Sequence, residues 1–201
     1  MIDIYTYIAL LLPFIISPGA SYVLTIAAVE KEGFSGVYRV ILGTVLGIAA
    51  HASLAAMGIS TLLLELPQLF SVIQVIGYLM LIYLGVSILR NLFKVTQPPA
   101  KIITTTRVFL LNIFNVKPLL LYVTIIPSFL QNTEISLYLH YLYVGITHIS
   151  LQITWLLFLG CFTMGAKKIN LHRILTFFSA GGSLFLIALG VFQLVKLVLE
   201  L

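Results

Sequence analysis

The chain has 201 residues, of which 61% are hydrophobic and only 8% are charged. Soluble domains carry about 25% charged residues, so this composition excludes an ordinary soluble protein and predicts a polytopic membrane protein. The formal net charge of +5 does not indicate nucleic-acid binding, because the basic residues lie mostly in short segments between apolar runs.

Six apolar runs are each long enough to cross a bilayer, and they predict an all-α integral membrane protein with six transmembrane helices. No segment of useful size for a soluble domain lies between them, so we expect a single membrane domain over residues 1–201. The chain starts without a basic n-region, which favours retention of the first run in the mature protein. In chain order, the predicted spans are Ile4–Val29, Val40–Leu64, Leu69–Leu89, Val108–Leu130, Leu137–Met164 and Ile174–Leu199.

The first run is interrupted by the sequence Ser17-Pro18-Gly19-Ala20-Ser21. The 26 residues of this run would form about 39 Å of helix, so the interruption falls near the centre of a hydrocarbon core of about 30 Å. Proline removes a backbone donor, and a Ser-Pro pair fits the N-cap and first position of a new helix. We therefore predict a helix that is broken at mid-membrane and whose second half directs free N–H groups at a cavity.

The fourth run contains a second interruption, Asn115-Val116-Lys117-Pro118. Asn115 is a good N-cap, and Pro118 suits the first turn of a new helix, so we predict a second helix broken at mid-membrane. Lys117 lies within this span, where a buried ammonium group without an acidic partner is costly. Lys117 could bind a substrate carboxylate or release its proton during transport, or it could only be held by carbonyl groups at the break.

Lysine and arginine are distributed unevenly between the loops. Nine of the eleven lie in the first, third and fifth loops, whereas the second and fourth loops hold none and carry Glu65 and Glu134. Cytoplasmic loops carry an excess of basic residues, so the odd-numbered loops are predicted to be cytoplasmic and both termini to be outside. The first of these loops is predicted to extend from Glu30 to Arg39.

The two halves of the chain resemble each other. Gly77–Val86 of the third run and Gly182–Val191 of the sixth are identical at seven of ten positions, at an offset of 105 residues. Because each half has three spans, the second half must insert upside down relative to the first. We therefore predict two inverted three-helix repeats, 1–97 and 98–201, with a binding site between them at the membrane midplane.

Several motifs occur together along nearly the whole chain. They are Pro18-Gly19-Ala20, the glycines Gly33, Gly36, Gly43 and Gly47, the pattern Tyr78-Leu79…Tyr83-Leu84-Gly85, and Asn112-Ile-Phe-Asn115-Val116-Lys117-Pro118. With these motifs the sequence resembles the LysE/RhtB (lysine exporter / homoserine-threonine resistance) family of bacterial amino-acid exporters. It differs from the family pattern at Ala20 and Val116, where the family has proline, and at Ser21, where Asn or Asp is common.

The resemblance implies a secondary transporter that exports small neutral amino acids or their derivatives across the bacterial cytoplasmic (inner) membrane, by alternating access and with proton coupling. The residues agree with a neutral substrate, since no Asp or Glu lies in a predicted span to pair with a cationic side chain. Two alternatives stay open, namely an exporter of another small ion or metabolite and a non-transporting membrane scaffold protein. The expected partners are an amino-acid substrate, protons and the lipid bilayer, and homo-oligomerisation is left open.

The candidate site combines the two interruptions. The residues expected to bind substrate are Ser17, Pro18, Gly19, Ser21, Asn112, Asn115, Lys117 and Pro118. His51 and His148, with Lys117, are candidates for a proton relay, because imidazole titrates near neutral pH. Each has a structural alternative: the serines could cap a kink, the asparagines could join helices, and the histidines could be packed neutral residues. Tyr22, Tyr78, Tyr83, Tyr122 and Trp155 could line a cavity or simply pack.

The single cysteine, Cys161, lies inside an apolar run and is expected to be a small buried residue. One cysteine forms neither an intrachain disulfide nor a Cys-x-x-Cys site. The spans also lack a nucleophile–base pair and an acidic cluster. We therefore expect no enzyme activity, no cofactor and no metal site.

Overall fold

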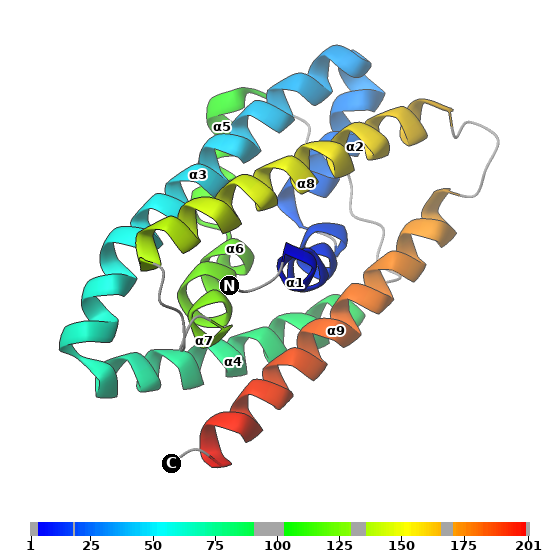
Figure 1. Ribbon diagram of the computed structural model, residues 1–201. Coiled ribbons are helices and arrows are strands. Elements are labelled where there is room, and N and C mark those ends of the chain that lie inside the picture. The colour runs from blue at the N-terminus through cyan, green and yellow to red at the C-terminus, as the bar shows by residue number, and fades with distance from the viewer. Residues whose placement is uncertain (1–3, 18, 91–102, 130–135, 166–170, 200–201) are drawn as a thin grey trace.

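The protein is described by a computed structural model that covers residues 4–17, 19–90, 103–129, 136–165 and 171–199. Every regular element in these residues is a helix (Figure 1). In chain order they are α1 (Ile4–Ile16), α2 (Ala20–Glu32), α3 (Phe34–Glu65), α4 (Pro67–Arg90), α5 (Thr105–Ile113), α6 (Val116–Leu120), the π-helical turn η1 (Leu121–Ile125), α7 (Ile126–Phe129), α8 (Leu137–Gly165) and α9 (Leu171–Leu199).

The helices α3, α4, α8 and α9 are each long and apolar enough to cross a membrane. The pair α1 and α2 also meets this test when taken together, with its axes bent by 56°. The pair formed by α5 with α6 and η1 does so as well, with a bend of 47°. The described part of the chain therefore contains four candidate spans, or six if each bent pair is one span.

The connection between α2 and α3 is much shorter than predicted. Gly33 alone separates the two helices, whereas the sequence suggested a loop from Glu30 to Arg39. Gly33 has a φ of +65° and donates its N–H to Val29 O, which ends α2 and turns the chain at once. A residue without a Cβ adopts this conformation at little cost. Glu32 and Arg39 form an ion pair across the turn, so the charged residues extend the two helices rather than a loop.

Two long antiparallel pairs enclose the shorter helices. In Figure 1, α3 lies along α8 and α4 lies along α9. Helix α1 packs on both α8 and α9, and α5 packs along α3. We call the end of the bundle where α1 begins and α9 ends the terminal side. The opposite end, which carries Lys31, Arg39, Arg90 and Arg107, is called the basic side.

Helices α4 and α9 approach each other through two glycines. A Cβ atom on Gly85 would lie 2.7 Å from both Ile187 Cγ1 and Ser183 O. A Cβ atom on Gly190 would lie 2.8 Å from both Ile82 Cγ1 and the backbone oxygen of Tyr78. Side chains at either glycine would therefore force the helices apart, which explains why small residues are needed at this crossing.

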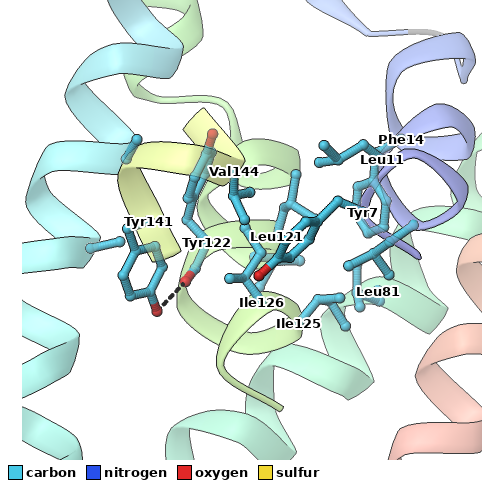
Figure 2. Close-up of a cluster of buried hydrophobic side chains, with 14 of the residues drawn as sticks. Tyr7, Leu11, Phe14, Leu81, Leu121, Tyr122, Ile125, Ile126, Tyr141 and Val144 are labelled. Carbon is cyan, nitrogen blue, oxygen red and sulfur yellow. Dashed lines mark hydrogen bonds between the residues drawn. The ribbon is translucent and has the colours of Figure 1, made fainter. Parts of the chain in front are cut away.

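Two apolar clusters fill the bundle, one toward each side. The terminal-side cluster includes the buried side chains of Tyr7, Phe14, Leu81, Leu121 and Tyr141. Figure 2 shows how its rings and branched side chains come together from α1, α4, η1 and α8. The basic-side cluster is made of smaller side chains, namely Leu24, Ala27, Ala28, Val40, Ile103, Val108 and Leu156.

Cys161 does not behave as expected. Its side chain is exposed on the surface of α8, whereas the sequence suggested a buried residue. The apolar face of a membrane helix can point at lipid as well as at the protein core, so hydropathy alone does not separate the two environments.

Candidate functional site

A small polar cavity lies between the two apolar clusters, where the breaks within the two bent pairs meet. Its volume is about 40 Å³, well below the roughly 150 Å³ of a cavity that holds a benzene ring. The cavity must therefore widen before it can hold an organic solute. It is lined by Phe14, Ile15, Ser17, Gly19, Ala20, Ser21, Tyr22, Thr44, Ile48, Asn112, Asn115, Lys117, Pro118, Leu121, His148 and Gln152.

Lys117 joins the two bent pairs. Its Nζ donates to the backbone oxygen of Ser17, at 2.7 Å, and to Ser17 Oγ, at 2.8 Å. The same ammonium group lies beside the start of α2, since a Cβ atom on Gly19 would be 3.7 Å from Nζ. The positive end of the α2 dipole and the lysine charge are therefore neighbours.

The break before α6 has the predicted cap. Asn115 is the N-cap of α6, and its Oδ1 accepts from the backbone N–H of Lys117 at 3.1 Å. Pro118 lies in the first turn and lines the cavity. The asparagine therefore positions the backbone that carries Lys117.

The prediction that Ser17 is the N-cap of α2 is wrong. Gly19 occupies that position and makes no side-chain cap. Ser17 instead closes the end of α1, because its N–H donates to Pro13 O and its Oγ donates to Phe14 O. Pro18, which was expected to start the new helix, lies outside the described residues.

Asn112 connects three helices at one wall of the cavity. Its Nδ2 donates to Ser21 Oγ of α2, at 3.0 Å, and to Thr44 Oγ1 of α3, at 3.3 Å. Thr44 in turn donates to Ser21 Oγ at 2.9 Å. Gly47 permits this approach, since a Cβ atom there would lie 2.5 Å from Asn112 Cβ.

The two predicted histidines occupy different places. His51 is buried but does not line the cavity, and its Nε2 lies 3.1 Å from the backbone oxygen of Asn112. A carbonyl oxygen only accepts, so Nε2 of His51 is the donor in this hydrogen bond. His148 does line the cavity, and its Nδ1 lies 3.1 Å from the hydroxyl of Tyr122.

The structure thus brings together Ser17, Gly19, Ser21, Asn112, Asn115, Lys117, Pro118 and His148 at one cavity. Thr44 and Gln152 also line it, although the sequence motifs did not predict them. A usable signal was the four-residue spacing of Gln152 from His148, which places both on one helix face. Among the described residues that line the cavity there is no Asp or Glu, and Lys117 is the one Lys or Arg. Such a site favours an anionic group.

The sequence of the chain is similar to those of known proteins. Residues 12–197 match the family described as LysE type translocator. The chain is 31% identical over 183 residues to the uncharacterized membrane protein YrhP of Bacillus subtilis, which covers 84% of this chain and 86% of that protein. It is 26% identical over 141 residues to the leucine efflux protein of Salmonella typhimurium, which covers 66% of each.

A further similarity covers a shorter part of the chain. An uncharacterized membrane protein of Pseudomonas aeruginosa is 32% identical over 97 residues. This match spans 48% of this chain and less than half, 45%, of the Pseudomonas protein. No solved structure matches the chain.

Proposed function

Because the chain belongs to the family of LysE type translocators, we propose that it is a secondary transporter that exports small neutral amino acids or their derivatives across the cytoplasmic membrane. The similarity to a leucine efflux protein supports the substrate class. We further propose that transport is coupled to protons and proceeds by alternating access.

The observation that carries the proposal is the uncompensated positive charge in the cavity. The ammonium group of Lys117 and the start of α2 lie side by side, and no described acidic side chain lines the cavity. A substrate carboxylate would supply the missing counter-charge. It would accept the remaining N–H of the Lys117 ammonium group, beside the two bonds to Ser17, in a charge-assisted hydrogen bond.

The absence of acidic lining residues also argues for the neutral side chain of the substrate. A lysine or arginine substrate would bring a second positive charge into a cavity that already holds Lys117. Placing two like charges in a site of low dielectric constant is strongly unfavourable. The cavity is bordered instead by apolar side chains such as Phe14, Ile48 and Leu121.

We propose six spans in two inverted repeats, 1–97 and 98–201, with each bent pair forming one broken span. The crossing of α4 and α9 supports this plan. Gly85 meets Ser183 and Ile187, whereas Gly190 meets Tyr78 and Ile82. Gly85, Tyr78 and Ile82 correspond to Gly190, Ser183 and Ile187 at an offset of 105 residues. This is also the offset of the sequence repeat. Reciprocal contacts of this kind are expected across a two-fold axis.

The basic residues near the ends of the described helices, Lys31, Arg39, Arg90 and Arg107, support an orientation with both termini outside and the basic side in the cytoplasm. Protons would then pass through groups at the cavity. Lys117 and His148 line it, and His51 reaches it through the backbone oxygen of Asn112. We propose these three residues as the proton relay.

The test is transport by purified protein in liposomes. The vesicles are offered leucine, methionine, threonine, homoserine, alanine, lysine and arginine, with a pH gradient imposed or collapsed. We expect gradient-dependent transport of one or more neutral amino acids and none of lysine or arginine. Transport of lysine or arginine alone would contradict the neutral substrate class. Transport of none of the seven would favour another small ion or metabolite, or a scaffold without transport activity.

A further inference from the structure

Helix α8 presents two polar groups to the cavity, His148 and Gln152, one helical turn apart. Gln152 is only 9% exposed. Within the part of the chain that the structure describes, its side-chain amide has no hydrogen-bond partner. The amide atoms border the open space of the cavity rather than closed protein, so they are available to a solute that binds there.

Most other acceptors of the cavity are already engaged. Both oxygens of Ser17 accept from Lys117, and Asn115 Oδ1 accepts from a backbone N–H. The hydroxyl oxygens of Ser21 and Thr44 accept from Asn112. These groups hold the helices together and are therefore poor candidates to bind a cationic group.

His148 offers a donor rather than an acceptor. Within the described residues, the hydroxyl of Tyr122 has Nδ1 of His148 as its hydrogen-bond partner. Because a buried phenol O–H needs an acceptor, Tyr122 donates to Nδ1 and the proton of the neutral ring lies on Nε2. The ring stacks on Tyr122 at a centroid distance of 5.8 Å, which fixes its orientation. The acceptor on this wall is therefore Oε1 of Gln152.

We propose that Gln152 Oε1 accepts a hydrogen bond from the ammonium group of the substrate. This inference rests on the proposed function, because it assumes an amino acid whose carboxylate pairs with Lys117. The substrate backbone then lies across the cavity, with its carboxylate at the bent pairs and its ammonium group at α8. Gln152 is thus a specificity residue that selects α-amino acids over acids of the same shape without an ammonium group.

The selectivity follows from the chemistry of the two ligands. An α-hydroxy acid keeps the carboxylate and the side chain of its amino-acid analogue but replaces the ammonium group with a neutral hydroxyl. Hydrogen bonds to charged groups are stronger than those between neutral groups. Losing such a bond should reduce the preference for the amino acid by about tenfold or more.

The experiment measures this preference in liposomes. The amino acid of the panel that the wild type transports best is the labelled substrate. Its unlabelled form and its 2-hydroxy analogue compete for uptake. The readout is the ratio of two inhibition constants, that of the 2-hydroxy analogue divided by that of the amino acid. Gln152→Met removes the acceptor at nearly constant shape. Gln74→Met is the matched control, because Gln74 is a buried glutamine of α4 that bonds Tyr78 and does not line the cavity.

We expect the ratio to fall about tenfold or more in Gln152→Met and to stay at the wild-type value in Gln74→Met. An equal loss for both competitors in Gln152→Met, or an unchanged ratio, would overturn the inference while leaving the proposed function intact. If Gln152→Met does not reach the membrane, Gln152→Asn decides, because its shorter side chain withdraws the oxygen and should also lower the ratio. Absence of amino-acid transport by the wild type would overturn both proposals.

Discussion

The two apolar clusters on either side of the cavity differ in what it takes to open them. The terminal-side cluster contains the large buried rings of Tyr7, Phe14 and Tyr141. The basic-side cluster contains no such ring among its buried members, which include Ala27 and Ala28, and the partly buried Trp155 packs against both clusters. Exposing apolar surface costs about 25 cal/mol per Å², so separating the helices is easier on the basic side.

This difference suggests which way the cavity opens first. In the proposed orientation the basic side faces the cytoplasm, which is where an exporter collects its substrate. The basic-side cluster would then be a weak cytoplasmic barrier and the terminal-side cluster a strong outer barrier. This arrangement suits an exporter that opens first to the cytoplasm. Substitutions in the polar layer and in the two clusters can test this asymmetry.

The strongest test concerns the polar layer itself. Lys117→Met removes the charge between the clusters while keeping a similar shape, and we expect export to fall at least about 30-fold, which corresponds to about 2 kcal/mol of lost binding. Export is measured in liposomes, and the amount of protein in the membrane is measured beside it. Lys196→Met is the control, because Lys196 is an exposed lysine near the end of α9. Full activity of well-inserted Lys117→Met protein would remove this lysine from the site.

The two barriers are compared directly with single cysteines. Ala27→Cys probes the basic-side cluster and Ala55→Cys the terminal-side cluster, both in a Cys161→Ser background. Both alanines are buried in the structure, at 0% and 4% exposure. We expect a water-soluble thiol reagent, added to open membrane fragments, to react several-fold faster at position 27. Equal rates, or a faster reaction at position 55, would contradict the asymmetry.

A pair of adjacent glycines tests the packing of α9 on the end of α1. A Cβ atom on Gly182 would lie 2.5 Å from Ser17 Cβ, whereas one on Gly181 would meet no atom within 4 Å. Gly182→Ala should cost about 1–3 kcal/mol and lower the melting temperature of the solubilised protein by several degrees. Gly181→Ala should leave it unchanged or raise it slightly. Equal melting temperatures for the two variants would show that α9 does not approach Ser17 so closely.

The smallest effect is expected at the basic surface. Glu32→Gln breaks the ion pair with Arg39. The side chain of Glu32 is 22% exposed and that of Arg39 is 44% exposed. Exposed pairs contribute about 0–1 kcal/mol, so the melting temperature should change by no more than a few degrees. Glu30→Gln, which alters an exposed neighbour, serves as the reference. A larger loss for Glu32→Gln would mean that the turn, rather than the basic-side cluster, holds α2 against α3.

Local chemistry explains which parts of this structure were predictable. The cap at Asn115 is confirmed because an asparagine bonds a backbone N–H two residues later in the same segment. The N-cap prediction at Ser17 was wrong because both serine and glycine are favoured at this position, and Gly19 occupies it in the structure. The loop at Gly33 was overestimated because charged residues extend a helix as readily as they form a loop.

Features that depend on distant contacts were not accessible from the pattern of residues. Thr44 is one of several polar residues of α3, and only the packing of the helices brings it to the cavity. Gln152 could be linked to the site only through its spacing from His148 on α8. The exposed side of α8, where Cys161 lies, has the same apolar character as its buried side. The substrate roles of the lining residues stay predictions until transport is measured.

The one-residue turn at Gly33 has a mechanical consequence. Glycine 33 links α2 to α3 without slack, and a Cβ atom on Gly36 would lie only 3.0 Å from Ala28, so the two helices are in tight contact beyond the turn. We therefore expect α2 and α3 to move together as one rigid unit. A movement of these helices that opens the basic-side cluster would then move Ser21 of α2 and Thr44 of α3 together. One wall of the cavity would move with them.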